Sequence, residues 1–245
     1  MKKYIYGLLL VLFAWGAQAQ DVAYYKVTTM RAAPGELLAL IDMLKEDMQN
    51  HKVYGMQQPF LMRHSQGDQW DLLMIYPIGN TLGNFMTDDA LEQRGKSKTQ
   101  DQPYGSSFYD LISFHEEQIV KGPAIDEFNR RFRTFSYYHV EIFQALAGKQ
   151  AELNKQREME NVYLTEIGRD TNLIFTKVFG GEDTSFTLGF YRDIKHYAES
   201  ADIPLDVENK AAVKAGFEGV HTIGSYLRSL IISHHDTLAG AVRAN

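Results

Sequence analysis

The sequence has no cysteine. This absence excludes disulfide bonds, a lipid-modified cysteine and a thiol nucleophile, so the folded chain must be held together by packing alone. It also has no Gly-x-Ser-x-Gly, Gly-x-Gly-x-x-Gly, P-loop or His-Glu-x-x-His motif. No sequence motif therefore indicates a serine hydrolase, a nucleotide-binding protein or a zinc protease.

The sequence also lacks an excess of basic over acidic residues and lacks long hydrophobic runs. The formal net charge of −6 opposes binding to nucleic acid or to an anionic membrane. The apolar run Tyr4–Trp15 is shorter than the ~20 residues that a spanning helix requires. With Lys2 and Lys3 before it and Ala17-Gln18-Ala19 after it, the run predicts a signal peptide over 1–19 and a soluble protein exported to the periplasm or the medium. An uncleaved N-terminal anchor is the alternative.

What the sequence does contain is an internal repeat. The stretches 105–115 (GSSFYDLISFH) and 224–234 (GSYLRSLIISH) match at an offset of 119 residues. Further matches at similar offsets are Tyr24–Val27 with Tyr137–Val140, and Tyr76 with Tyr191. Offsets that change only in small steps are typical of a duplicated unit with loop insertions. The sequence predicts repeat 1 over 20–121, a linker over 122–134 and repeat 2 over 135–245.

Within each repeat, the hydrophobic pattern predicts the order strand, helix, strand, strand, helix, strand. In repeat 1 we expect strands at 24–30, 60–65, 70–76 and 108–116, a helix at 37–48, and a short helix through Leu82, Phe85 and Met86. In repeat 2 we expect strands at 137–144, 172–179, 186–191 and 226–234, and helices at 148–167 and 204–215. In the linker, the spacing of Ile125, Phe128 and Phe132 predicts a short docked helix.

This pattern resembles the dimeric α/β-barrel superfamily, in particular its antibiotic-biosynthesis-monooxygenase-like and NIPSNAP-like branches, fused in tandem. The residues that carry the resemblance are the tyrosine-rich first strand, Pro34-Gly35 before the first helix, and the paired Tyr76 and Tyr191. The fold class predicted is α+β: two tandem ferredoxin-like βαββαβ units whose antiparallel sheets pack face to face as an intramolecular barrel.

The resemblance implies a ligand cavity between the two sheets. Alternation along the third strands predicts that Leu73, Ile75, Phe186, Leu188 and Phe190 lie under the helices. The opposite face, which would line the cavity, carries Trp70, Leu72, Met74 and Tyr76 with Ser185, Thr187, Gly189 and Tyr191. From this face we take Trp70, Tyr76 and Tyr191, together with Lys26 on the first strand, as ligand-binding candidates. The alternative is that the same residues form only an inter-sheet core.

A histidine and a glutamate share one face of the strand at 137–144. His139 and Glu141 are two residues apart, and charged groups on a central strand are costly unless they line a wet cavity or pair with each other. We take them as the candidate catalytic residues, with His139 as a base oriented by Glu141. Repeat 1 has Lys26 and Thr28 at the matching positions, so a site here would be asymmetric.

Two cofactors are open, and the sequence favours neither. His115 with Glu117 and His234 with Asp236 are matched pairs that suit a divalent metal, with His235, Glu116 or His139 as a third ligand. Haem is the other alternative, and the histidines available for it in repeat 2 are His196, His221, His234 and His235.

Three functions from different classes fit these observations. The first is an exported binding protein whose inter-sheet cavity accepts a small apolar or aromatic molecule. The second is a cofactor-independent monooxygenase or isomerase of the type that the resemblance implies. The third is a haem-binding or purely structural protein whose aromatic faces serve self-association. The sequence does not define the ligand, the reaction, the oligomeric state or the repeat that carries the site.

Overall fold

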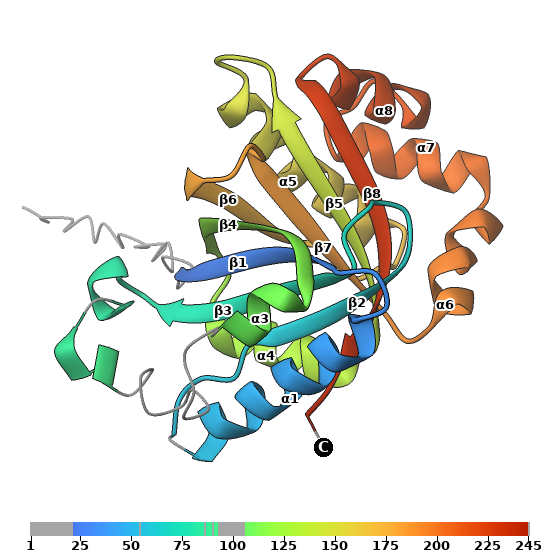
Figure 1. Cartoon of the computed structure of the whole chain (residues 1–245). Coiled ribbons are helices and arrows are strands. Elements are labelled where there is room, and N and C mark those ends of the chain that lie inside the picture. The colour runs from blue at the N-terminus through green and yellow to red at the C-terminus, as the bar shows by residue number, and fades with distance from the viewer. Residues whose placement is uncertain (1–21, 54, 86, 90, 93–105, 245) are drawn as a thin grey trace, which may run out of the picture.

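A closed antiparallel barrel is the centre of the structure, a computed structural model that describes residues 22–53, 55–85, 87–89, 91–92 and 106–244 (Figure 1). Within these residues, eight strands close in the order β1-β3-β2-β8-β5-β7-β6-β4. The run β4-β1-β3-β2 from the first half of the chain is followed in the second half by β8-β5-β7-β6, the same relative order. The seams between the halves are the antiparallel pairs β2–β8 and β4–β6. The predicted signal peptide lies outside the described residues.

The bounds of the elements are as follows. The strands are β1 (Ala23–Ala32), β2 (Phe60–Gln66), β3 (Leu72–Gly79), β4 (Ile112–Gly122), β5 (Tyr137–Ala145), β6 (Leu173–Gly180), β7 (Ser185–Tyr191) and β8 (Ile231–Val242). The α-helices are α1 (Leu37–Val53), α3 (Ser106–Asp110), α4 (Ile125–Thr134), α5 (Gln150–Glu166), α6 (Ile194–Ala198), α7 (Leu205–Lys214) and α8 (Val220–Arg228). The 3-10 helices in the described residues are η1 (Leu82–Phe85) and η2 (Glu199–Asp202).

The matched glycine-to-histidine stretches differ from the prediction in the same way in both halves. We expected strands from Phe108 and from Tyr226, but these residues belong to α3 and α8, and the strands begin only at Ile112 and Ile231. Aromatic residues favour strands, but Phe108 and Tyr226 each lie in a short helix that packs on the barrel. The short helix expected through Met86 is the 3-10 helix η1, and Met86 itself lies outside the described residues.

The barrel interior is filled by aromatic side chains, and α4 closes one end of it. Phe128 on α4 stacks on Phe60 with ring centroids 3.8 Å apart, and Phe175 stacks on Phe186 at 4.4 Å. At Gly122, an added Cβ would lie 2.4 Å from the Phe175 ring. The linker helix is therefore confirmed, but the interior between the sheets is a close-packed core rather than the ligand cavity that we predicted.

The predicted faces of the third strands are reversed. Leu73 and Ile75 point into the barrel with the three apolar residues of β7, while Leu72 and Met74 point outward against α1. Both faces of β3 are apolar, so alternation shows which residues share a face but not which face is inside. The aromatic residues on alternate positions of β7 pack inside because a closed barrel needs large side chains to fill it.

Helices cover the outside of the barrel in two places (Figure 1). On the first half, α1 packs Leu40, Leu44 and Met48 against β2 and β3. On the second half, α5 lies on β5 and β7, and α7 packs on α5 in turn. None of the helices in the described part of the chain is both long and apolar enough to cross a membrane.

Truncation of Phe128 to Ala should destabilise the protein by about 3–5 kcal/mol, because the ring is fully buried among five other aromatic residues at the closed end of the barrel. Urea unfolding followed by circular dichroism measures this change. Leu38→Ala is the matched control, since Leu38 is 68% exposed on α1 and should cost less than ~0.5 kcal/mol. Equal losses in the two variants would contradict the assignment of α4 to the core.

Candidate functional site

A polar layer is buried between α5 and the outer face of β5 and β7. Helix α5 turns Gln156 and Arg157 toward the sheet, and both are almost completely buried. The sheet in turn presents Glu141 and Thr187, which are 9% and 1% exposed. Burying charged groups in this way is costly for stability, and such layers are typical of functional sites.

Arg157 holds two carboxylates in this layer. Its guanidinium Nη1 lies 3.4 Å from Glu141 Oε2, and its Nη2 pairs with Glu160 one turn along α5. The hydroxyl of Thr187 donates a hydrogen bond to the same Glu141 oxygen at 2.9 Å. The guanidinium also lies 4.7 Å from the centre of the Phe143 ring, so one face of it is packed against an aromatic side chain. Glu141 is fixed by these contacts.

A second hydrogen-bonded group lies next to it on β5 and β8. The Nε2 atom of His139 is 3.1 Å from Asp236 Oδ1, and the Nε2 atom of His234 is 3.0 Å from Asp236 Oδ2. Asp236 lies directly opposite Glu141 in the β5–β8 pairing, which brings the four groups together. The side chain of His139 is 16% exposed and that of Asp236 is 50% exposed, so solvent reaches the pair from the Asp236 side.

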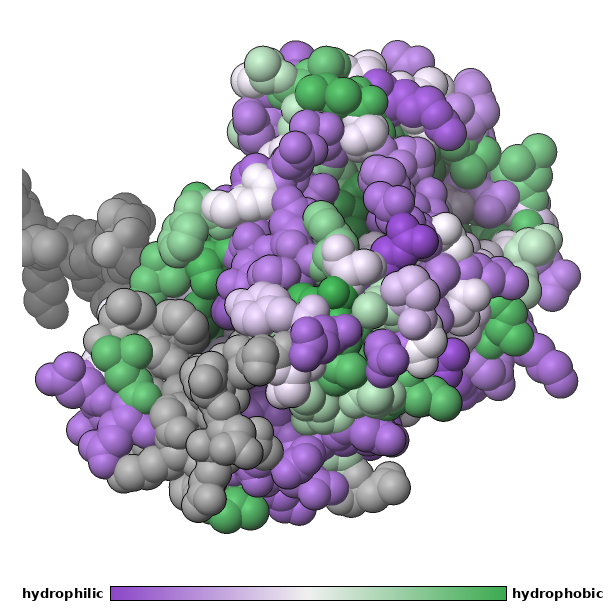
Figure 2. Space-filling view, in the orientation of Figure 1, coloured by the Kyte–Doolittle hydropathy of each residue, from purple (hydrophilic) through white to green (hydrophobic). Residues whose placement is uncertain are grey.

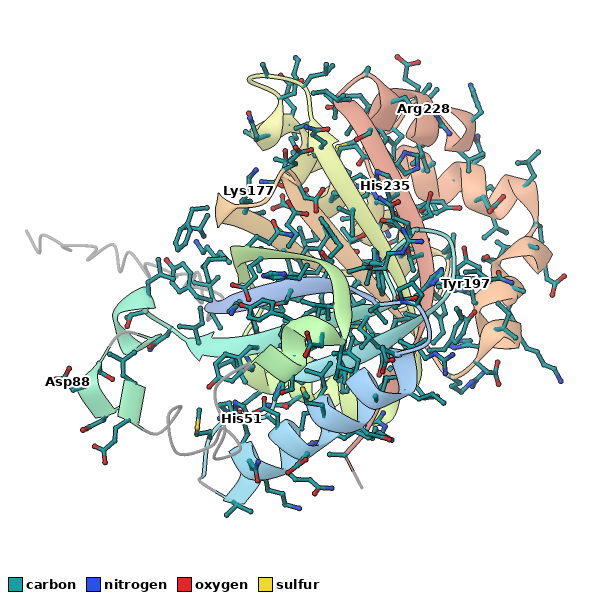
Figure 3. All side chains as sticks on the ribbon, in the orientation of Figure 1. His51, Asp88, Lys177, Tyr197, Arg228 and His235 are labelled. Carbon is teal, nitrogen blue, oxygen red and sulfur yellow. The ribbon has the colours of Figure 1, made fainter. Side chains whose placement is uncertain are left out.

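Two tyrosines stand beside the histidine. The ring centre of Tyr197 on α6 lies 5.4 Å from that of His139 and 5.1 Å from that of Tyr191 at the end of β7. Figure 3 shows Tyr197 beside the lower part of β8. The guanidinium of Arg169 packs over the Tyr191 ring at 5.5 Å. An aromatic wall therefore flanks the His139–Asp236 pair.

The electrostatics of the site set the protonation of these groups. Burial acts to lower the pKa of His139, but the hydrogen bond to Asp236 and the negative charges of Glu141 and Asp236 outweigh it, so the pKa is raised. The hydrogen bond from His139 in turn lowers the pKa of Asp236. Burial raises the pKa of both Tyr191 and Tyr197, so both remain hydroxyl donors at neutral pH.

Three of these side chains are also close enough to share a metal ion. The ligand atoms of His139, Glu141 and Asp236 lie within 4.8 Å of one another. The Oε2 atom of Glu141 is already bound by Arg157 and Thr187, and both Asp236 oxygens are bound by histidines. A neighbouring guanidinium also disfavours an added cation. The arrangement suits proton transfer better than metal binding.

The first half of the chain has a counterpart of this pair. Lys26 and Glu117 on β1 and β4 form an ion pair of 2.6 Å. In the β1–β4 pairing Thr28 lies opposite Glu117, just as Glu141 lies opposite Asp236 in the β5–β8 pairing. Lys26 and Thr28 therefore stand where the second half has His139 and Glu141. The two halves thus carry different ionisable groups at equivalent positions.

The remaining candidates do not join the His139 site. Trp70 is buried in the barrel core beside His64, on the inter-sheet side that the sequence predicted, and it packs there as part of the core. Tyr76 packs against His51 under α1, and the His115 ring lies 6.0 Å from that of Tyr109. His139 is the group that completes the cluster around Asp236 and His234.

The four histidines considered for haem have separate environments. His196 accepts a hydrogen bond from the Arg192 backbone, His221 is exposed on α8, His234 binds Asp236, and His235 lies 3.5 Å from Asp68. His234 and His235 are neighbours on a strand and so point to opposite faces of the barrel. These four residues do not form a common haem-binding surface.

Sequence reasoning missed Gln156, Arg157, Glu160 and Tyr197. A signal was available: the helix at 148–167 has few apolar positions at helical spacing but must still pack on a sheet. Such a helix has to bury polar groups, and those groups need partners on the sheet beneath. Tyr197 carried no such signal, because it reaches the site from a short helix in a loop region.

Comparison with solved structures shows a shared fold. An anthrone oxidase-like protein superposes with a TM-score of 0.58 at 9% sequence identity, covering 92% of this chain and 93% of the other. A proposed monooxygenase from Fusobacterium nucleatum gives a TM-score of 0.51 at 10% identity, covering 91% and 94%. A proposed chlorite dismutase gives 0.49 at 12% identity, covering 91% and 96%. The first two show that the chain shares their α+β fold.

Comparison by sequence gives no further assignment. No protein-family model matches the chain, and no curated protein matches it significantly. The resemblance to the NIPSNAP-like branch stays a prediction.

Replacing Asp236 by Asn should lower the pKa of His139, because the variant loses the charge that favours the imidazolium while the burial remains. An NMR titration of the imidazole resonances measures the shift. Asp68→Asn is the control, since Asp68 pairs with His235 and should leave the His139 titration unchanged. An unchanged His139 pKa in Asp236→Asn would show that the pair does not form in solution.

Replacing Arg157 by Met should destabilise the protein by about 3–5 kcal/mol, because Glu141 and Glu160 would remain buried without a cation. Chemical unfolding at pH 7 measures the loss. Lys210→Met removes a cation from an exposed pair with Asp206 and should cost at most ~1 kcal/mol. If both variants lose the same small amount, the polar layer is hydrated rather than buried.

Proposed function

We propose that the protein is a cofactor-independent oxidase or monooxygenase that acts on a small aromatic molecule with an acidic C–H bond. The observation that carries the proposal is the partly exposed His139–Asp236 pair, with its two flanking tyrosines, on the outer face of the barrel. The fold shared with an anthrone oxidase-like protein supports the same class of reaction. This proposal replaces a binding site inside the barrel, because the interior is filled by aromatic rings.

Each group has a defined task in this proposal. Asp236 accepts the Nε2 proton of His139, which leaves the Nδ1 lone pair of the neutral imidazole free to act as the base. Within the described residues, no protein group hydrogen-bonds that Nδ1 atom. The hydroxyl of Tyr197 donates to the oxygen on which negative charge develops. Glu141 does not touch His139 and acts only through its charge, so Asp236 takes the positioning role that the sequence suggested for Glu141.

The reaction balances without a bound cofactor. With anthrone as the example, the base removes one proton from C10 and gives an enolate. The enolate adds O2 and recovers a proton, which gives a C10 hydroperoxide, and loss of water from the hydroperoxide gives anthraquinone. One anthrone and one O2 yield one anthraquinone and one water, so O2 is the oxidant. The protein contributes proton abstraction and stabilisation of the enolate.

Two further parts of the proposal concern architecture and location. We propose that the halves of the barrel are tandem ferredoxin-like units. The repeated strand order and the equivalent positions of the Lys26–Glu117 and His139–Asp236 pairs support this. We also propose that residues 1–19 direct export, on the basis of their basic, apolar and Ala-x-Ala pattern.

The test of the proposed function is oxidation of anthrone by O2, followed by the absorbance of anthraquinone and by an oxygen electrode. We expect turnover above the spontaneous rate, and a loss of about 10²–10⁴-fold in His139→Gln, which lacks the base. The kcat/KM should rise with pH as His139 loses its proton, with a midpoint above the ordinary histidine value, and this midpoint should fall in Asp236→Asn.

His221→Gln is the matched control, because His221 is exposed on α8 and should retain full activity. Addition of EDTA should leave the rate unchanged. Full activity in His139→Gln would remove the assigned base. A rate that EDTA abolishes and Zn²⁺ or Mn²⁺ restores would instead assign the cluster to a metal ion.

A further inference from the structure

A groove runs between α1 and the outer face of the barrel. It has a volume of about 680 Å³, within the range of small-molecule sites. Its floor is Gly240 of β8, and the nearest atom that an added Cβ would meet there is a backbone oxygen at 3.9 Å, so the space above the strand is open. One wall is a stripe of α1 at helical spacing, Leu38, Ile41 and Lys45, and the others include Arg63 of β2 and Tyr137 of β5.

The strand register places this groove beside the proposed base. Arg63 lies opposite Gly240 in the β2–β8 pairing, and Gly240 lies opposite Tyr137 in the β5–β8 pairing, so the three residues share the outer face. His139 follows Tyr137 by two residues on the same face of β5, about 7 Å along the strand. Arg63 is two strands away from Tyr137, about 10 Å across the sheet. A fused-ring molecule that contacts Arg63 can therefore reach His139.

The groove is basic, although the chain as a whole is acidic. Among the described residues that line it are three cations, Lys45, Arg63 and Arg243, and one carboxylate, that of Asp42, whereas the formal net charge of the chain is −6. Arg243 donates to two backbone carbonyl groups at the end of α4. In the described part of the chain, the side chains of Lys45 and Arg63 have no ion-pair or hydrogen-bond partner. Two cations are thus available to an anionic ligand.

Apolar and aromatic surfaces complete the groove. Tyr137 lies opposite Tyr191 in the β5–β7 pairing, and the ring of Tyr191 lies 5.1 Å from that of Tyr197 between centres. These tyrosines form one aromatic wall from the groove to His139. Across from them, Leu38 of α1 is 68% exposed, and Figure 2 shows hydrophobic residues beside hydrophilic ones over this helix. Such walls favour a ligand with a flat aromatic body.

We propose that this groove holds the carboxylate end of the aromatic substrate, so that the substrate is a fused-ring aromatic acid. The guanidinium of Arg63 donates two parallel hydrogen bonds to the carboxylate, and Lys45 adds a second positive charge. The rings lie over Gly240 and along Tyr137, with the reacting carbon at His139. A cationic ligand is repelled by the same groups. The inference rests on the proposed oxidation at His139 for the reaction, but binding of the acid is measured without turnover.

The binding test is an NMR titration of protein labelled at the isoleucine methyl groups. The probes are 2-naphthoate and 2-naphthamide, which has the same shape without the charge. We expect 2-naphthoate to shift the methyl resonances of Ile41 and the imidazole resonances of His139, and to bind about tenfold more tightly than 2-naphthamide. Ile41→Val assigns the methyl resonances.

Two arginine variants locate the charge that the ligand meets. Arg63→Met should remove the preference for 2-naphthoate, because methionine keeps an apolar stem without the guanidinium. Arg228→Met is the matched control, since it removes the same charge from α8, away from α1, and should leave the preference unchanged (Figure 3). The proposal is overturned if 2-naphthamide binds as tightly as 2-naphthoate, or if the two variants lose the same affinity. Inorganic phosphate that binds as tightly as 2-naphthoate would also overturn it, because only charge would then be recognised.

Kinetics with two substrates separate this inference from the proposed function. With anthrone-2-carboxylate in place of anthrone, KM should fall about tenfold with little change in kcat, and Arg63→Met should abolish this gain. Oxidation of both substrates with equal KM would contradict the groove assignment and leave His139 as the base. Arg63-dependent binding of 2-naphthoate without oxidation of either anthrone would contradict the proposed oxidation and leave the ligand class of the groove.

Discussion

Close packing of aromatic rings inside the barrel is the constraint on which the rest of this structure depends. Two four-stranded sheets joined at their edges leave an interior that only large side chains can fill, and Phe128 from α4 completes the packing at one end. Because the core excludes even a methyl group at Gly122, ligands are excluded from it as well. Chemistry is thereby confined to the outer face, where helices meet the sheets.

Burying Arg157 between two carboxylates is costly for stability, but the two ion pairs hold the polar side chains in fixed positions. The arginine holds Glu141, whose negative charge helps to raise the pKa of His139. Asp236 supplies the direct hydrogen bond to His139 and remains open to solvent. The site thus combines a rigid buried side with an accessible one, an arrangement that suits a base that must meet a small substrate.

Much of the fold followed from the sequence because hydrophobic periodicity reports secondary structure directly. The order of most strands and helices along the chain and the docked linker helix were visible in this way. The faces of β3 were assigned wrongly because Leu72 and Met74 are as apolar as Leu73 and Ile75, and only barrel closure decides between them. His139 and Glu141 stood out as charges on a central strand, but the role of Asp236 required the β5–β8 register.

Alternation along β5 places two separate requirements on neighbouring residues. Tyr138, Val140 and Ile142 belong to the core, while His139 and Glu141 face α5. Substitutions at the outward positions can change the polar site without disturbing the packing of the barrel core. Lys26 and Thr28 on β1 illustrate a different outcome on the same framework. The framework of the barrel therefore leaves the residues on its outer face free to carry different polar groups.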